Sequence, residues 1–299
     1  MNTHVDLILR RRWPRFRDEF KAPEVDKETF AQQLYDFRII DKSVSFFNPW
    51  LSIFDEAAFL LKLEGDLLVD WGDSSPKKAK SLLGVAFLVH KALTEALSFR
   101  LLVLAGYEDS GRVLLRTMME SLDLALLFFT DQKLARLFWA DKSRPTTFWH
   151  EHLSHGRGAN RFKELVAKVA EQRKHLRDQG VRRGSVYAQL SEQVHSSPSA
   201  SVRAYAHPSI EHPGLLAVSP FGRLGAQAPG VLVAAYGYVI THADIFIHCI
   251  LGKLQVFDLD RKKFGPRIAQ IIARFNLFHE VASLFEKDLR RLERELKLE

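Results

Sequence analysis

Residues 77–130 read KKAKSLLGVAFLVHKALTEALSFRLLVLAGYEDSGRVLLRTMMESLDLALLFFT, and this stretch decides the fold class. Its apolar residues recur at helical spacing, and no run alternates with the period of two that marks a β-strand. Pro76 follows two serines, which is a good helix start, while Gly106 ends one helix and the acidic Glu108 and Asp109 begin another. We therefore expect helices over 77–105 and 109–130, folded back on each other as an antiparallel hairpin.

The same helical spacing extends over most of the 299 residues. We expect the hairpin to lie at the centre of an all-α multi-helix bundle, with helices 184–196 and 230–257 packed against it. Residues 197–229 contain five prolines among glycine and serine and are expected to form the one long loop. The remaining predicted helices span 27–47, 54–70, 132–141, 159–178 and 265–297.

The chain divides into three predicted parts: residues 1–75 with a basic arm and helices, a helical core domain over 76–257, and a heptad-patterned helix within 258–299. A hydrophobic content of 46% is enough for a sizeable core. The single cysteine, Cys249, excludes an intrachain disulfide framework and suits a reducing compartment. No apolar stretch of signal-peptide length follows the basic run at 10–12, so we expect a cytoplasmic protein.

Two segments, 82–104 and 231–251, are apolar enough to be tested as membrane spans. Both contain ionisable side chains, and each such group costs roughly 2.5–3.5 kcal/mol at a bilayer centre. We therefore interpret both segments as buried helices of the bundle and expect no membrane association. The ionisable residues are His90, Lys91, Glu95, Arg100, His242, Asp244 and His248.

The last predicted helix carries a heptad seam, in which apolar residues alternate at spacings of three and four. Acidic residues flank its second half, so two copies of the helix would place like charges against each other. We therefore expect the seam to dock on a basic face of its own domain or of another protein. The seam comprises Ile268, Ile271, Phe275, Phe278, Ala282, Phe285, Leu289, Leu292 and Leu296, and the flanking acids are Glu286, Asp288, Glu293 and Glu295.

A polar stripe runs along the otherwise apolar helix 109–130. Arg112, Arg116, Glu120 and Asp123 follow one another at spacings of 4, 4 and 3, which places them on one face. Such a stripe either faces water as a salt-bridge ladder or lines a pocket. The order of arginine before glutamate is the less favourable one for helix stability, and both interpretations stay open.

A second polar stripe lies on the predicted helix 184–196, where Tyr187, Ser191 and His195 are each four residues apart. His195 falls in the last helical turn, where the helix dipole favours a protonated imidazole. A histidine placed there can act as a general acid or base near neutral pH. The alternative is a structural role, with a capping histidine and a tyrosine and serine bonded to nearby backbone.

The two helices together resemble a bacterial family of uncharacterised all-helical domains of the HEPN-like superfamily. The first, YEDSGRVLLRTMMESLDL at 107–124, has an R-x-x-x-E motif at Arg116 and Glu120, and the second, YAQLSEQVH at 187–195, reads Y-x-x-L-S-x-x-x-H. The resemblance covers residues 77–257 approximately. It implies a bundle in which Arg116, Glu120, Tyr187, Ser191 and His195 converge. Active HEPN proteins are metal-independent ribonucleases, often toxins or antiviral effectors, and are commonly homodimers.

The resemblance and the net charge of +7 lead to the hypothesis that the protein binds or cuts RNA in bacterial defence or in a toxin–antitoxin pair. His195 would then transfer the proton of the 2′-hydroxyl or leaving group, Arg116 would stabilise charge on the phosphate, and Glu120 would orient one of them. No metal or other cofactor is expected. The residues expected to bind the nucleic acid are Arg112, Arg173, Lys174, Arg177, Arg182 and Arg183.

The sequence also departs from the HEPN ribonuclease signature, in which four to six residues separate an arginine from the histidine that follows it. Ala188, Gln189 and Leu190 occupy those places before His195. The opposing hypothesis is a non-catalytic helical interaction protein that uses the C-terminal seam and the basic arm at 10–17. Whether the protein is an enzyme is therefore left open.

Two further histidine groups have structural interpretations. His150, His152 and His155 lie in the segment WHEHLSH and are expected at the surface, because no cysteine or carboxylate cluster accompanies them. In the apolar helix 230–257, Tyr238 and His242, and likewise Asp244 and His248, stand four residues apart. We interpret these four as satisfied buried polar groups rather than as metal ligands.

Overall fold

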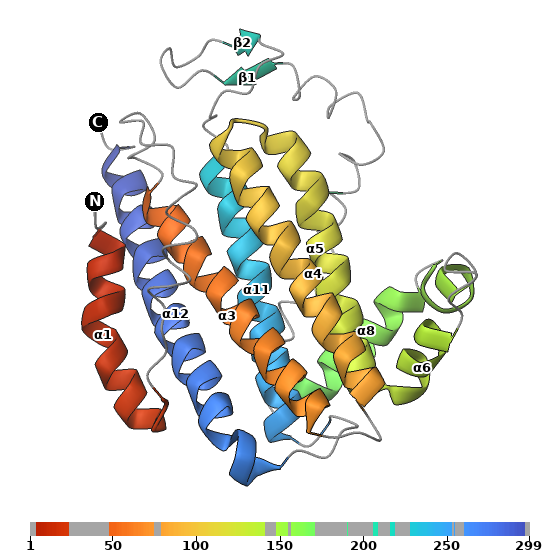
Figure 1. Cartoon of the computed structure of the whole chain (residues 1–299). Helices are drawn as coiled ribbons and strands as arrows, with labels where there is room; N and C mark the ends of the chain where they lie inside the picture. Colours follow the sequence, from red (N-terminus) through yellow and green to blue (C-terminus); the bar gives the residue numbers. More distant parts are fainter. Residues whose placement is uncertain are drawn as a thin grey trace.

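The computed structural model describes residues 4–23, 48–74, 79–140, 148–154, 157–170, 190, 206–208, 216–218, 228–252, 254 and 260–296. In these ranges the protein is an all-α bundle with one short pair of strands (Figure 1). A five-residue π-helix spans Trp149–Leu153. The α-helices are α1 (His4–Phe20), α3 (Asn48–Asp73), α4 (Ala79–Leu104), α5 (Glu108–Thr130), α6 (Gln132–Ala140), α8 (Arg157–Ala170), α11 (Ala228–Leu251) and α12 (Arg261–Leu296).

The predicted central hairpin is confirmed, because α4 and α5 run antiparallel and pack along their length (Figure 1). Gly106 forms the turn with a φ of 79°, a left-handed conformation that glycine adopts without strain. The Tyr107 amide donates to the Leu102 carbonyl across 2.8 Å and closes the end of α4. At Gly111 a Cβ atom would lie 3.2 Å from the Phe99 ring, so the missing side chain allows the two helices to approach closely.

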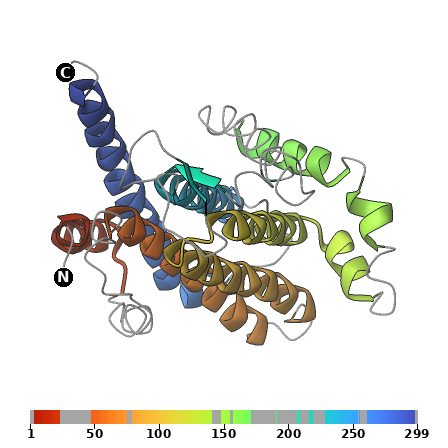
Figure 2. The ribbon, with the colours of Figure 1, turned by 90° about the horizontal axis from the view of Figure 1, so that it is seen from above.

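The bundle is built outward from this hairpin: α3 packs on α4, α11 packs on α3 and α5, and α12 packs on α3 (Figures 1 and 2). One aromatic cluster joins four of these helices. The ring centroid of Trp71 from α3 lies 5.9 Å from that of Phe129 in α5 and 6.4 Å from that of Phe264 in α12. Phe246 of α11 lies 5.1 Å from Phe129. The buried apolar residues of all three predicted parts therefore belong to one hydrophobic core.

In the described part of the chain, two helical segments are long and apolar enough to cross a membrane, Ser81–Leu104 and Pro229–Leu251. They belong to α4 and α11, and both lie within the bundle. Half of the first segment's most apolar window is buried, against 67% of the second. Their place among the packed helices agrees with the prediction of core helices.

The basic N-terminal run is a helix packed on the bundle and not an extended arm. Val5, Leu9 and Phe16 of α1 are buried, and the guanidinium carbon of Arg274 in α12 lies 3.7 Å from the centroid of the Trp13 ring. Packing explains why this helix forms, since most helical stability in proteins comes from burial of an apolar face and not from local propensity. The ion pair between Arg12 and Glu280 adds a polar link to α12.

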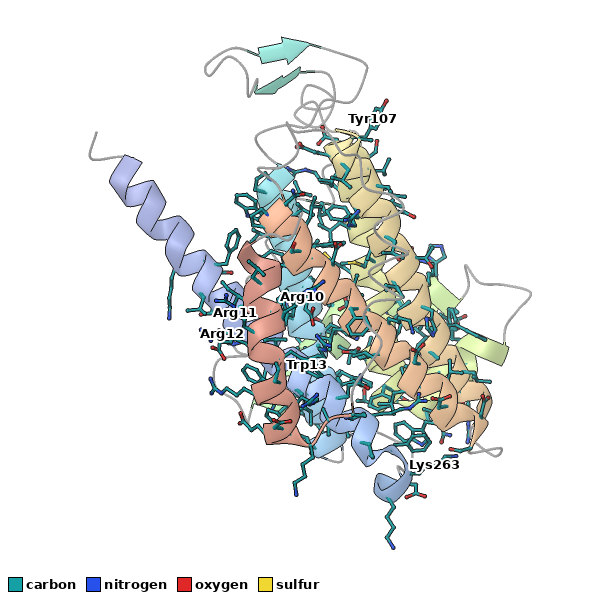
Figure 3. The ribbon with its side chains drawn as sticks, turned by 60° about the vertical axis from the view of Figure 1, so that its left-hand side comes forward. Arg10, Arg11, Arg12, Trp13, Tyr107 and Lys263 are labelled. Carbon is teal, nitrogen blue, oxygen red and sulfur yellow. The ribbon has the colours of Figure 1, made fainter. Side chains whose placement is uncertain are left out.

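The first half of the C-terminal seam docks on its own domain, one of the two predicted alternatives, and does so through apolar and aromatic contacts with α3 and α11. Its buried residues are Ile271, Phe275, Phe278 and Ala282. Phe278 contacts Tyr236 of α11 with ring centroids 6.2 Å apart, and Phe285 contacts Trp50 of α3 at 5.2 Å. The last turns of α12 continue as a helix to Leu296 and project beyond the other helices (Figures 2 and 3).

The segment predicted as one long loop contains two short strands, β1 (Ala206–Pro208) and β2 (Leu216–Val218). They pair antiparallel, with Ala206 opposite Val218. Strands of three residues are too short to show an alternating pattern in sequence, which is why this pair was not predicted. The predicted helix 27–47 lies outside the described residues. Of the predicted helix 184–196 only Leu190 is described, and it is helical and buried.

Candidate functional site

The polar stripe of α5 is half-buried and internally paired. Arg116 Nε donates to Glu120 Oε1 across 3.1 Å, and the two side chains are 18% and 24% exposed. One turn earlier, Arg112 Nε lies 3.7 Å from Asp109 Oδ1, with both side chains less than one-fifth exposed. Each guanidinium group therefore has a carboxylate of its own helix beside it.

These exposed fractions are lower than those expected of a fully solvated ladder. A ladder of surface salt bridges would leave its long side chains largely in water, where each pair contributes only about 0.2–1 kcal/mol. Arg112, Arg116 and Glu120 are instead mostly covered, and each takes part in at least one further interaction. The stripe is therefore a partly covered series of ion pairs along α5, and both of its interpretations stay open.

Asp123, the fourth member of the stripe, has a different role. It is buried at the contact between α5 and α11, where the hydroxyl of Tyr238 donates a hydrogen bond to its Oδ1 atom. A buried carboxylate needs such a partner because desolvation without one is costly. Asp123 therefore holds two helices together, and the part of the stripe that remains near the surface ends at Glu120.

The polar groups of α11 are buried and paired, as the sequence predicted. His242 Nε2 lies 3.0 Å from Glu64 Oε2 on α3, and both side chains are almost completely enclosed. His248 Nδ1 donates to the backbone carbonyl of Asp244 across 2.7 Å and lies 3.1 Å from its Oδ1 atom. In the described ranges, no three His, Cys, Asp or Glu side chains come together as a set of metal ligands.

Sequence reasoning missed three acids of α3 that pair with other helices, of which Glu56 and Glu64 are buried and Asp55 is 13% exposed. Asp55 pairs with Arg100 of α4 and Glu56 with Arg274 of α12, in addition to the pair of Glu64 with His242. The available signal was the presence of carboxylates inside the apolar run 54–70 and of isolated arginines inside two other apolar helices. The signal shows that each charge needs a buried partner but does not show which one.

Several predicted site residues lie outside the described residues, so the convergence of the two motif helices stays a prediction. They are Tyr187, Ser191, His195, Arg173, Lys174, Arg177, Arg182 and Arg183. Among the histidines of WHEHLSH, His150 is exposed, and the ring of His152 lies 5.0 Å from that of Phe148. His155 lies outside the described residues.

Positive charge is exposed on several helices, and α1 and α8 each present a basic face. Arg10, Arg11 and Arg15 of α1 are exposed, and Figure 3 labels the first two. On α8, one face buries Phe162, Leu165, Val166 and Val169, and the opposite face exposes Arg157, Lys163 and Lys168. Such basic faces attract polyanions in a salt-dependent way but carry no sequence specificity of their own.

Two buried groups have pKa values shifted by desolvation. Burial raises the pKa of the Cys249 thiol to about 12. Burial also raises the pKa of the Tyr236 hydroxyl above its usual value, with a smaller contribution from the negative charge of Glu286. Both groups therefore stay protonated at neutral pH, and neither has the accessible, ionised character of a nucleophile.

No protein-family model matches this chain, and neither a curated protein nor a solved structure matches it.

Proposed function

We propose that this protein binds RNA at the polar face of α5, with Arg112 and Arg116 contacting backbone phosphate. The observation that supports the proposal is the half-buried Arg116–Glu120 pair on the central hairpin. A carboxylate beside an arginine holds the planar guanidinium in one orientation, which suits bidentate recognition of a phosphate group. The net charge of +7 and the exposed basic faces of α1 and α8 support a polyanionic partner.

The resemblance to HEPN-like proteins extends the proposal to metal-independent cleavage. His195 would act as the general acid or base, Tyr187 and Ser191 would lie beside it, and Arg116 would stabilise the negative charge that develops on the phosphate. Glu120 would keep Arg116 in position. In this chemistry the 2′-hydroxyl attacks the neighbouring phosphate, and a proton moves from that hydroxyl to the leaving oxygen.

Binding is tested by titrating labelled single-stranded RNA with the full chain and with Arg116→Ala and Arg136→Ala variants. Arg136 is an exposed arginine on α6 and serves as the matched control for loss of one charge. We expect Arg116→Ala to weaken binding at least tenfold, about 1.4 kcal/mol, and Arg136→Ala to change it far less. Equal effects of the two substitutions, with unchanged melting temperatures, would place the RNA elsewhere.

Cleavage is tested separately by incubating labelled RNA with the protein in EDTA. We expect the wild-type chain to cut the RNA without metal and His195→Ala to bind it without cutting. If binding depends on Arg116 but the RNA stays intact in EDTA, the proposal of RNA binding stands and the proposal of ribonuclease activity is wrong. A His195→Ala variant that cuts at the wild-type rate would show that His195 is not catalytic.

The end of α12 favours a second candidate function, a helical interaction protein. This end projects beyond the bundle, and the heptad seam continues through it at Leu289, Leu292 and Leu296. The acids beside this part of the seam favour a partner helix with basic flanks. The basic run of α1, by contrast, is engaged with α12 of its own chain through Arg12 and Glu280.

This second function is tested with a chain that ends at Lys287, which retains the seam residues that are buried in the bundle. If the projecting end binds a partner helix, the shortened chain keeps its melting temperature and loses binding to a basic-flanked heptad peptide. Equal peptide binding by the shortened and full chains would remove this candidate.

A further inference from the structure

We propose that the outer face of the α4–α5 hairpin is a self-association surface, on which α4 packs antiparallel against α4 of a second copy. The face is unusually apolar for a solvent-exposed surface. Phe87 and Leu101 of α4 are 57% and 42% exposed, and Val113 of α5 is 37% exposed. Leu97 of α4 and Leu114 of α5 are partly buried and pack against the edge of the core. Grouped exposed apolar side chains of this size mark interaction sites, whereas single ones do not.

The exposed side of α4 carries a heptad pattern of its own. Leu83, Phe87, His90, Thr94, Leu97 and Leu101 follow at spacings of 4, 3, 4, 3 and 4. Phe87, Thr94 and Leu101 are exposed, and the other three are intermediate, so none of the six belongs to the fully buried core. A seam of this kind is what a helix presents to a partner helix.

The pattern is symmetric about Ala92, and this symmetry favours a second copy as the occupant. A twofold axis between the two helices, at the level of Ala92, places Leu83 opposite Leu101 of the other copy. It likewise places Phe87 opposite Leu97 and His90 opposite Thr94. Apolar residues thus meet apolar residues at both ends, and polar residues meet at the centre. A twofold interface must be self-complementary in this way, because the same surface serves both subunits.

Charge distinguishes the antiparallel orientation from the parallel one. Lys91 Nζ donates to Ser121 Oγ across 3.0 Å, and the Ser121 hydroxyl donates to Glu95 Oε2 across 3.2 Å. Lys91 also pairs with Glu95 directly. The antiparallel axis places Lys91 two residues along the helix from both Glu95 and Lys91 of the second copy, and it separates the two Glu95 side chains by six residues. A parallel arrangement would place both like-charged pairs at the same level, so repulsion is weaker in the antiparallel one.

The face is also large enough for a stable contact. From Leu83 to Leu101 it is roughly 27 Å long at a rise of 1.5 Å per residue, and α5 widens it to two helices. Specific interfaces typically bury roughly 800 Å² per partner, so the proposed contact must extend over both α4 and α5. Val113 lies beside Arg112 on α5, so this face adjoins the proposed RNA face, and the tests below therefore change residues of α4 and leave Arg112 and Arg116 in place.

The first test measures the mass of the full chain by analytical ultracentrifugation over a range of concentrations. We expect a dimer that Leu101→Glu converts to a monomer, with Phe87→Glu giving the same result. Leu137→Glu is the matched control, since Leu137 is 39% exposed on α6, and it should stay dimeric. Melting temperatures show that the variants are folded. A wild-type chain that stays monomeric at every concentration overturns the proposal, as does a dimer that withstands both substitutions.

The second test determines the orientation by disulfide cross-linking. Under oxidation a mixture of Leu83→Cys and Leu101→Cys chains should form a cross-linked dimer, because these positions face each other across the antiparallel axis. Leu101→Cys alone should cross-link poorly, since its two copies lie at opposite ends of the interface. Efficient cross-linking of Leu101→Cys with itself contradicts the antiparallel arrangement. A monomeric chain that binds lipid vesicles through Phe87 would show that the face serves a membrane and would overturn the proposal.

Discussion

Arg100 shows how a single charge is accommodated inside this bundle. Its side chain is 2% exposed, and it binds Asp55 through two hydrogen bonds, from Nε across 2.6 Å and from Nη2 across 3.1 Å. A bidentate pair satisfies both carboxylate oxygens, and the low local dielectric strengthens the attraction. In the same environment, removal of either partner leaves the other as an unpaired charge inside the protein, which lowers the free energy of unfolding.

We predict that Asp55→Ala lowers the free energy of unfolding by about 3–5 kcal/mol, because it leaves the Arg100 guanidinium buried without its carboxylate. The matched control is Asp66→Ala, which removes the partner of Lys62 on the same helix at a site where both side chains are more than one-third exposed. That change should cost no more than about 1 kcal/mol. Urea denaturation of the three chains gives the comparison, and equal losses would contradict the buried-pair account.

A second prediction at this scale concerns the thiol of Cys249, which is fully buried and has its pKa raised to about 12. The thiolate is the reactive species, so the native protein should not react with a thiol-specific disulfide reagent at pH 8. The same chain in urea should react with one equivalent of the reagent within minutes. Rapid labelling of the native chain would show that α11 opens frequently or that the thiol is accessible.

The raised pKa of the Cys249 thiol also affects the stability of the protein at alkaline pH. The unfolded chain releases the thiol proton above about pH 8.5, whereas the folded chain retains it until its higher pKa is reached. The unfolded state therefore gains free energy between these two values, and stability falls as the pH rises through that range. A Cys249→Ala chain should show a shallower loss of stability between pH 8 and 10, which chemical denaturation at several pH values would detect.

At the scale of elements, α12 has two parts with different roles. Its first part supplies core residues such as Phe278 and the buried Arg274, which pairs with Glu56 across 3.3 Å. Its last turns project beyond the bundle (Figure 2). The helix is thus a structural element along most of its length, and its projecting end is the part for which we propose a partner helix.

We predict that deleting residues 265–299 prevents stable folding, because it removes a side of the core and leaves Glu56 buried without its arginine. A chain ending at Lys287 should remain soluble and melt within a few degrees of the full chain. Soluble yield and melting temperature measure both outcomes. A folded, soluble protein lacking 265–299 would show that α12 is dispensable for the core.

At the scale of the whole molecule, α3 is the element that ties the bundle together. Three of its acids reach three different helices: Asp55 binds Arg100 of α4, Glu56 binds Arg274 of α12, and Glu64 binds His242 of α11. Pairs of this kind contribute little net stability, but they can favour one arrangement of the helices over others. They define which helix lies on which face of α3, while the aromatic cluster around Trp71 fills the space between them.

The sequence by itself determined the all-α class, most helix positions and the central hairpin. These properties are local, because helical spacing and a glycine such as Gly106 are read from neighbouring residues. The buried polar character of Tyr238, His242 and Asp244 also followed from local context, since ionisable groups inside an apolar helix must find partners. The stripe of α5 was recognised in the same way, but its degree of burial was not.

Only the tertiary structure decided which residues meet. The buried pairs join positions 45 to 218 residues apart, and no local pattern specifies the partner of an isolated buried charge. The N-terminal basic run becomes the helix α1 because α12 offers it an apolar surface, and the strands 206–208 and 216–218 exist only through their pairing. Contacts between distant segments depend on how whole helices pack, and packing is a property of the assembled core rather than of any stretch of sequence.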